Sequence, residues 1–326
     1  MKKILTICLL GVLVLSGCQN STDVTTNQQE DDSLLIVCTI YPICDWIEVI
    51  AEDKVTIDYL LDNGIDLHQY QPSAQDIIQI SISDLVVYVG GDSDTWASSV
   101  IAEDINALSL ISYVSEDVLI EYEEDHDHED ESDEEDHDHE DEADEEDHGH
   151  EHTTDEHIWL SLKLAKQMVV LIGEEIIALD PENEDFYRNN MENYISELVA
   201  LDQEYADMIS TSKNDIIVVT DQFPLNYFVN DYGLNYVAAF EGCSADSEVT
   251  FETMKLLVDT AADENIHYII TMENSQYGIA DSILSMQPDL IELSFDSMQS
   301  RVAGSDEGSY LKTMKENLEV LRIALN

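Results

Sequence analysis

A long run of acidic and histidine residues interrupts the chain and sets the first limit on its fold. Residues 125–152 read DHDHEDESDEEDHDHEDEADEEDHGHEH. The run offers no large apolar side chain that a core could bury, and its like charges repel one another. It therefore cannot belong to a packed core, and we predict a disordered, solvated loop over residues 121–153.

Histidine is the informative residue in this run, because a segment that served solubility alone would need only charged side chains. Seven of the ten histidines of the chain lie there. Imidazole is largely uncharged near neutral pH, and together with carboxylates it binds borderline divalent metals such as zinc. The composition predicts a weak metal-gathering loop that uses His126, His128, His137, His139, His148, His150 and His152.

The N-terminus has the pattern of an export signal. A lysine pair precedes an apolar stretch over 4–15, which is too short to span a membrane comfortably. The stretch ends in LSGC, which resembles the lipobox of bacterial lipoproteins and implies that Cys18 carries a lipid. We expect a signal peptide over 1–17, a flexible tether over 18–33, and an extracytoplasmic protein held at the cell membrane by its lipid anchor.

The net charge and the remaining cysteines limit which ligands and which metal sites the protein can have. The formal net charge of −60 argues against nucleic acid, whose phosphates an acidic surface repels. No C-x-x-C spacing supports a cysteine zinc site. Cys38 lies in an apolar, strand-like run, where a buried free thiol is common. A disulfide between Cys44 and Cys243 is an alternative that spacing alone does not decide.

Short apolar runs alternate with amphipathic runs in both halves of the chain, which indicates parallel sheets covered by helices. We expect strands over 34–40, 55–61, 84–90, 215–220, 236–240, 267–271 and 290–295. We expect helices over 43–51, 73–82, 158–179, 225–232, 251–264 and 309–325.

Residues 182–210 form one long periodic stretch without proline or glycine, which predicts a single long helix. The predicted fold is α/β, with two αβ lobes that contain parallel sheets and are joined by this rigid helix. The first lobe covers 34–181, the linking helix 182–212 and the second lobe 213–326. Ligands of such folds bind at the carboxyl ends of strands, so we expect a metal cleft between the lobes.

Two histidines outside the acidic run stand at the borders of predicted elements. His68 follows a strand and precedes a helix, in NGIDLHQYQPS. His157 stands where the acidic run stops and the apolar pattern resumes, in TDEHIWL. Either residue alone would be unremarkable, because a lone histidine in a loop is more often an ordinary surface residue.

With their flanks, these segments resemble the solute-binding lipoproteins of zinc and manganese ABC importers, the TroA-like family. The family loop G-x-D-P-H-x-Y-x-P-[ST] is matched by Gly64, Asp66, His68, Tyr70, Pro72 and Ser73, with Leu67 in place of the proline. The family segment D-x-H-[IV]-W-L, just after an optional loop rich in His, Asp and Glu, is matched by Asp155, His157, Ile158, Trp159 and Leu160.

The resemblance implies a metal site with His68 and His157 as ligands, and with Asp296, after the last strand, as a further ligand. The third family ligand is His or Glu, and its register falls on Gln222, which is a poor zinc ligand. The adjacent Asp221 is chemically suitable, so we assign the third position to Asp221, with Gln222 beside the ligands. Asp221 is also suited to cap the helix that follows.

Glu273 matches a family glutamate near the cleft, and we expect it to support the ligands from behind, since ligating imidazoles need an orienting acceptor. A site of two histidines and two carboxylates suits Zn²⁺ or Mn²⁺. The histidine-rich loop favours Zn²⁺, because manganese gains little from extra imidazoles.

The resemblance implies an extracytoplasmic receptor that delivers Zn²⁺, with Mn²⁺ as the alternative, to the permease of an ABC importer. We expect a monomer that performs no catalysis. Two alternatives stay open, a zinc-dependent hydrolase and a surface adhesin lipoprotein of the same fold. The sequence has no H-E-x-x-H, nucleophile-elbow or phosphate-loop motif, which weighs against the hydrolase.

Overall fold

The computed structural model describes residues 33–61, 64–123, 152–240, 242, 249–275, 278–299, 301 and 308–326. The expected signal peptide and lipidated Cys18 lie outside these residues, as do the histidines between 126 and 150. In the part of the chain that is described, no helix is both long and apolar enough to cross a membrane.

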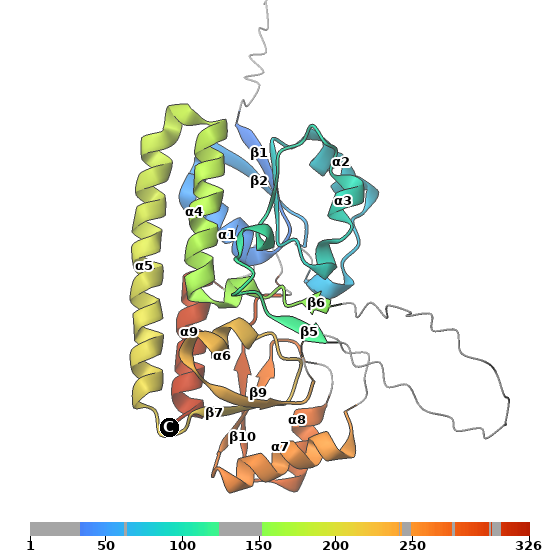
Figure 1. Ribbon diagram of the computed structural model, residues 1–326, viewed down its shortest axis with the longest axis vertical. Helices are drawn as coiled ribbons and strands as arrows, with labels where there is room; N and C mark the ends of the chain where they lie inside the picture. The colour runs from blue at the N-terminus through green and yellow to red at the C-terminus, as the bar shows by residue number, and fades with distance from the viewer. Residues whose placement is uncertain are drawn as a thin grey trace, which may run out of the picture. The chain divides into compact units, whose positions relative to one another are not determined.

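A parallel sheet forms the centre of the first lobe (Figure 1). Its strands are β1 (Leu34–Cys38), β2 (Val55–Tyr59), β3 (Leu85–Tyr88) and β4 (Ala107–Ser109), in the order β2-β1-β3-β4. The accompanying helices are α1 (Tyr41–Ala51), α2 (Ala74–Ile82) and α3 (Ala97–Val100). The central strands β1 and β3 are apolar and largely buried, because helices cover both faces of the sheet.

The second lobe repeats this strand order. Its parallel strands are β7 (Ile216–Val219), β8 (Asn235–Ala238), β9 (Tyr268–Met272) and β10 (Ile291–Phe295), in the order β10-β9-β7-β8. Its helices are α6 (Asn226–Tyr232), α7 (Phe251–Asp263), α8 (Ile279–Met286) and α9 (Tyr310–Ala324). In each lobe the strand order reverses beside the first strand, and ligands of α/β folds bind at the carboxyl end of such a switch point.

Two helices, α4 (Leu162–Leu179) and α5 (Glu184–Thr211), pack against each other beside the sheets (Figure 1). The Tyr194 hydroxyl of α5 donates a hydrogen bond to Asp45 of α1 (3.4 Å), and the Tyr205 hydroxyl donates to the Met314 carbonyl of α9 (2.5 Å). α5 therefore contacts both lobes, as the predicted linking helix requires. Its buried residues recur every three or four positions, namely Tyr187, Met191, Tyr194, Leu198, Leu201, Tyr205 and Met208.

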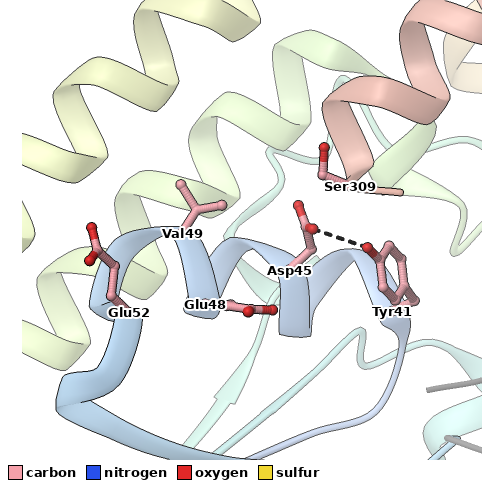
Figure 2. A pocket seen from close by; sticks show the side chains of 6 residues that line it. All are labelled: Tyr41, Asp45, Glu48, Val49, Glu52 and Ser309. Carbon is pink, nitrogen blue, oxygen red and sulfur yellow. Dashed lines mark hydrogen bonds between the residues drawn. The ribbon is translucent and has the colours of Figure 1, made fainter. Parts of the chain in front are cut away.

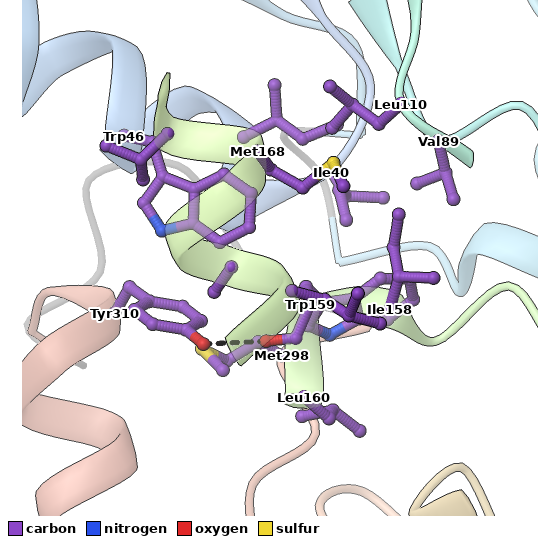
Figure 3. Packing of buried hydrophobic residues seen from close by; sticks show 14 of the residues in the cluster. Ile40, Trp46, Val89, Leu110, Ile158, Trp159, Leu160, Met168, Met298 and Tyr310 are labelled. Atoms are coloured by element: carbon purple, nitrogen blue, oxygen red, sulfur yellow. Dashed lines mark hydrogen bonds between the residues drawn. The ribbon is translucent and has the colours of Figure 1, made fainter. Parts of the chain in front are cut away.

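The segment that follows His157 is anchored to the second lobe in the core. Trp159 Nε1 donates to the Ser297 carbonyl (2.8 Å), and the Tyr310 hydroxyl donates to the Trp159 carbonyl (2.6 Å). Figure 3 shows Trp159 and Tyr310 in one buried cluster with Trp46, whose ring centroid lies 5.2 Å from that of Tyr310. A displacement of Trp159 would leave buried polar groups without partners, so the backbone next to His157 is held firmly.

A small antiparallel hairpin base frames the acidic run. It consists of β5 (Glu121–Glu123) and β6 (His152–Thr154), with Glu123 opposite His152. The predicted loop over 121–153 therefore has paired strands at both ends, and His152 belongs to β6. Pairing brings the two ends of the run close together in space, next to the segment that carries His157.

The expectation of a free thiol at Cys38 and the alternative pairing of Cys44 with Cys243 were both wrong. Cys38, at the end of β1, forms a disulfide with Cys44 in the first turns of α1, with a distance of 5.6 Å between their Cα atoms. Cys38 is therefore not a free thiol, and Cys44 is not available to Cys243. The reason is that the chain turns directly from β1 into α1, which brings two nearby cysteines to a distance that a disulfide can bridge.

The hairpin base leads to a prediction about stability. Replacing residues 124–151 by an Asn-Gly turn should change the free energy of unfolding of the metal-free protein by less than about 1 kcal/mol, because a two-residue turn can join paired strands and the deleted residues have no large apolar side chain. Thermal and urea unfolding followed by circular dichroism measure this. A loss of several kcal/mol would show that the acidic run contributes to the fold.

Candidate metal centre

The same kind of local hydrogen bond fixes the backbones of the two predicted histidine ligands. His68 lies in the 3-10 turn between β2 and α2, and Asp66 Oδ1 accepts a hydrogen bond from its backbone N–H (2.9 Å). His157 lies just after β6, and Asp155 Oδ1 accepts from its backbone N–H (2.9 Å). In both cases a carboxylate two residues upstream closes a turn.

The structure brings these two imidazoles together. Their Nε2 atoms are 3.3 Å apart and their ring centroids 5.3 Å apart, although the residues are 89 positions apart in the chain. The side chain of His157 is 3% exposed and that of His68 is 24% exposed. The pair is therefore largely buried, with access to solvent on the His68 side.

Each ring is held at its other nitrogen by a carboxylate. His157 Nδ1 lies 2.7 Å from Asp155 Oδ1, and His68 Nδ1 lies 3.0 Å from Glu156 Oε1. Ser93 Oγ lies 2.8 Å from His68 Nδ1 and donates to Glu156 Oε1, while the Ser93 backbone N–H donates to Glu156 Oε2 (3.2 Å). Two consecutive residues, Asp155 and Glu156, thus orient both rings.

These carboxylates decide which nitrogen of each ring can bind a metal. A carboxylate only accepts hydrogen bonds, so Nδ1 of each neutral ring carries the proton and Nε2 keeps its lone pair. Two lone pairs that face each other at 3.3 Å require a shared proton or a cation between them. Tetrahedral zinc, with Zn–N bonds of about 2.0–2.1 Å, places two ligand nitrogens about 3.3–3.4 Å apart, so the spacing fits zinc.

The charges of His68 and Glu156 are coupled. Burial lowers the pKa of His68, but the hydrogen bond and charge of Glu156, together with the charges of Asp66 and Asp155, outweigh burial and raise the pKa above its usual 6.5. Burial raises the pKa of Glu156, but the hydrogen bond and charge of His68, together with the charge of His157 and the hydrogen bond from Ser93, outweigh burial and lower the pKa below its usual 4.5. The His68 contribution to stability is complete below pH 6.5 and is lost as pH rises through its raised pKa, whereas the Glu156 contribution is complete above pH 4.5 and is lost on acidification.

Asp155 also connects His157 to the second lobe. Asp155 Oδ2 accepts hydrogen bonds from the Tyr122 hydroxyl of β5 (2.8 Å) and from the Asn226 amide of α6 (3.1 Å). Asn226 also donates to the Tyr122 hydroxyl, and the Tyr227 hydroxyl donates to the Asp155 carbonyl (2.8 Å). Burial alone raises the pKa of Asp155, but the charge of His157 and the hydrogen bonds that it receives lower it, so Asp155 is an ionised acceptor.

Asp221 lies just after β7 and is 2% exposed. Its Oδ1 accepts from the Gln222 N–H (2.9 Å) and its Oδ2 from the Met272 N–H (3.2 Å), which joins the ends of β7 and β9. Burial raises the pKa of Asp221. The alternative role as a helix cap is wrong, because α6 begins only at Asn226 and its N-cap residue is Leu225. Gln222 is partly exposed beside Asp221.

Asp296 lies at the end of β10 and is paired with an arginine. Its Oδ2 lies 2.6 Å from Arg301 Nη2, and its Oδ1 accepts from the Met298 N–H (2.8 Å). Arg301 is 2% exposed, and its guanidinium lies 4.6 Å from the ring centroid of Tyr41. The carboxylate of Asp296 is therefore fixed in orientation by a buried cation.

Glu273, just after β9, supports the loop that follows β10. It accepts from the backbone N–H and the hydroxyl of Ser297 (both 2.7 Å) and from the Gln299 N–H (3.1 Å). Burial, together with the charge of Asp296, raises the pKa of Glu273 to about 7. The acceptors that orient the imidazoles in this structure are Asp155 and Glu156.

Among the residues that the structure describes, no group of three or more His, Cys, Asp and Glu side chains is placed to hold a metal ion. The structure brings His68 and His157 together, while Asp221, Asp296 and Glu273 make their described contacts within the second lobe. Sequence reasoning missed Glu156. The signal for it was an acidic residue between the Asp and the His of the D-x-H segment.

A separate hollow of about 540 Å³ lies beside α1 (Figure 2). The Tyr41 hydroxyl donates to Asp45 Oδ1 (3.1 Å) and to the Gly308 carbonyl (2.7 Å), and burial raises the pKa of Asp45. The hollow is lined by Tyr41, Asp45, Glu48, Val49, Glu52 and Ser309. This lining includes none of the predicted metal ligands, so the hollow is distinct from the histidine pair.

These features agree with comparisons to known proteins. The family model described as zinc-uptake complex component A, periplasmic (ZnuA), matches residues 36–324, and the chain belongs to this family. The periplasmic zinc-binding protein TroA from Treponema pallidum has the same fold, with a TM-score of 0.71 at 19% identity over 90% of this chain and 99% of that one. The predicted fold of two αβ lobes and a linking helix is thus confirmed.

Three curated relatives align over nearly the whole chain. The zinc-binding lipoprotein AdcA of Streptococcus pneumoniae is 29% identical over 99% of this chain, which spans 61% of the length of AdcA. The high-affinity zinc uptake system protein ZnuA of Bacillus subtilis is 29% identical, covering 96% of this chain and 94% of its own length. The manganese ABC transporter substrate-binding lipoprotein PsaA of S. pneumoniae is 26% identical over 100% of both chains.

The coupling between His68 and Glu156 can be measured directly. Glu156→Gln should lower the pKa of His68 in the metal-free protein, because the neutral amide removes the attraction that raises it. Titration of the imidazole signals by NMR gives this value. His267, which is exposed and far from the pair in the chain, is the internal control, and the substitution should leave its signals unchanged. An unchanged His68 titration would contradict the prediction.

Proposed function

We propose that this protein is an extracytoplasmic receptor that captures Zn²⁺ and delivers it to the permease of an ABC importer. The observation that supports the proposal best is the pair of Nε2 atoms 3.3 Å apart, each on a ring whose Nδ1 is held by a carboxylate. Membership of a zinc-uptake family adds independent support. Binding and handover need no chemical step, and we propose no catalysis.

The proposed ligand set takes one pair of ligands from each lobe. His68 and His157 bind through Nε2, and Asp221 and Asp296 supply carboxylate oxygens. The oxygens of Asp221 accept from the Gln222 and Met272 N–H groups, and the side chain of Ser275 also hydrogen-bonds to Asp221. The oxygens of Asp296 accept from the Met298 N–H and from Arg301. A carboxylate oxygen has two lone pairs, so an oxygen that accepts one hydrogen bond can also bind a cation. Two anionic ligands together with two neutral imidazoles would compensate the charge of a divalent ion.

Zinc is the proposed cargo and manganese the alternative. Two imidazole ligands at tetrahedral spacing suit Zn²⁺, while Mn²⁺ prefers more oxygen ligands in octahedral geometry. The relatives AdcA and ZnuA are named for zinc and PsaA for manganese, so similarity alone supports both ions.

We further propose that the protein is a lipid-anchored monomer outside the cell membrane. The lipobox-like LSGC at Cys18 and the names of two relatives as lipoproteins support the lipid anchor. The acidic run would gather zinc weakly near the centre through its seven histidines, because imidazoles interspersed with carboxylates bind several ions without a fixed geometry.

Loss of either histidine tests the proposed ligands. His68→Ala and His157→Ala should each weaken zinc binding at least about tenfold, because each removes one of four ligands. Calorimetric titration of protein that lacks residues 124–151 avoids interference from the acidic run, and His267→Ala is the matched control. Unchanged tight binding in the double variant His68→Ala/His157→Ala would exclude this site, and zinc-dependent hydrolysis of generic esters would favour the hydrolase instead.

The choice between Asp221 and Gln222 as the third ligand needs its own test. Asp221→Ala should weaken zinc binding more than Gln222→Ala, because a carboxylate binds a divalent cation far better than an amide. Asp221 also holds the Met272 N–H, so the unfolding temperature of each metal-free variant must be measured alongside. A larger loss of affinity for Gln222→Ala would assign the ligand to the family register.

A further inference from the structure

Glu156 is a charged side chain in an almost fully buried position. It is 4% exposed, and its carboxylate contacts His68 Nδ1 (3.0 Å), the Ser93 hydroxyl and the Ser93 backbone N–H (3.2 Å). Burial of an ionised carboxylate costs free energy unless its oxygens are paired. These contacts pair both oxygens of Glu156, and they place its negative charge directly behind the ring of His68.

A glycine in the first lobe makes room for this carboxylate. A Cβ atom at Gly91 would press against Glu156 Oε2 and lie 2.5 Å from Glu156 Cβ. The backbone of Gly91 has φ of −85°, which any residue can adopt, so the backbone itself does not require glycine here. The space for Glu156 is what requires it.

We propose that Glu156 is the positioning residue of His68, and that Gly91 is required because it leaves the space in which Glu156 does this. The proposal rests on the proposed function, in which His68 binds the metal through Nε2. Glu156 fixes the ring plane and keeps the proton on Nδ1, so that the Nε2 lone pair points at His157. Asp155 does the same for His157, so one dipeptide aligns both imidazoles.

The alternative is that Glu156 only stabilises the fold. If Glu156 only stabilises the fold, its variants should be less stable, but the tautomer of His68 should not change. A positioning role predicts that moving the carboxylate, with its charge intact, changes the tautomer of His68 and the affinity for zinc. Gly91→Ala makes this distinction, because it displaces the Glu156 side chain without removing it.

The experiment compares zinc affinity and the tautomer of His68 across a set of variants. Glu156→Ala and Gly91→Ala should each weaken zinc binding about 10- to 100-fold, as loss of an orienting partner behind a metal ligand typically does. Glu156→Gln should retain more affinity than Glu156→Ala, since the amide oxygen can still accept from Nδ1. Nitrogen-15 NMR of His68 in the metal-free variants should show a shift toward the Nε2–H tautomer.

Matched controls remove two simpler explanations. Glu174→Ala deletes one exposed negative charge on α4, where Glu174 pairs with Arg188, and it tests whether net charge alone lowers affinity. Gly173→Ala adds a methyl group that meets Met191 between α4 and α5, and it tests whether crowding elsewhere has the same effect. Neither control should change zinc affinity or the His68 signals.

A double variant tests whether Gly91 acts through Glu156. In a Glu156→Gly background, which lacks the Cβ as well as the carboxylate, the space beside Gly91 is vacant, so adding Gly91→Ala should cause no further loss of affinity. Equal losses in both backgrounds, or an unchanged His68 tautomer in Glu156→Ala, would overturn the proposal. If Gly91→Ala does not fold, Ser93→Ala, which removes the hydroxyl that touches both groups, should shift the His68 signals in the same direction.

The tautomer measurement separates this proposal from the proposed function. If the wild-type protein does not bind zinc but His68 still changes tautomer in Glu156→Ala and Gly91→Ala, then the function fails and the positioning role stands. If zinc binds tightly and none of the Glu156 or Gly91 variants alters His68, then the positioning role fails and the function stands.

Discussion

Two buried imidazoles keep their Nε2 lone pairs facing each other only if another group holds the proton of each ring on Nδ1. Asp155 and Glu156 do so by accepting at Nδ1 of His157 and His68, at 2.7 Å and 3.0 Å. Because each carboxylate lies behind its ring, the lone pairs converge on one point where a cation can bind. The other features of the centre serve this arrangement, including the turns that hold both histidine backbones and the serine that supports Glu156.

Asp155 also connects the histidine pair to the second lobe. Asp155 receives hydrogen bonds from Asn226 of α6 and from Tyr122 at the base of the acidic run. Trp159, two residues after His157, donates to the Ser297 carbonyl in the second lobe. A change in the arrangement of the lobes would therefore disturb the partners of His157 directly. Under the proposed function, this gives a physical route by which contact with a permease would loosen a bound ion, since an imidazole that loses its acceptor becomes a weaker ligand.

Much of the architecture was predictable from local patterns. The seven expected strands are present with ends within two residues of the predicted ones, because runs of Ile, Val and Leu covered on both faces give a strong signal. Three-residue β4 and the short helices α3 and α8 were not predicted, since such segments carry too little pattern. α4 begins at Leu162 and not at residue 158, because Ser161 caps it and the preceding turn is held by Trp159 contacts.

The sequence by itself determined the two-lobed α/β fold and singled out His68 and His157, whose rings the structure brings together, because periodicity and local motifs are written in neighbouring residues. Only the tertiary structure decided that Cys38 bonds to Cys44 and that Glu156 and Gly91 belong behind His68. Glu156 is adjacent to His157 in the chain, yet it orients the other histidine. No local pattern encodes that choice, because it depends on which side chains the folded first lobe places around a buried carboxylate.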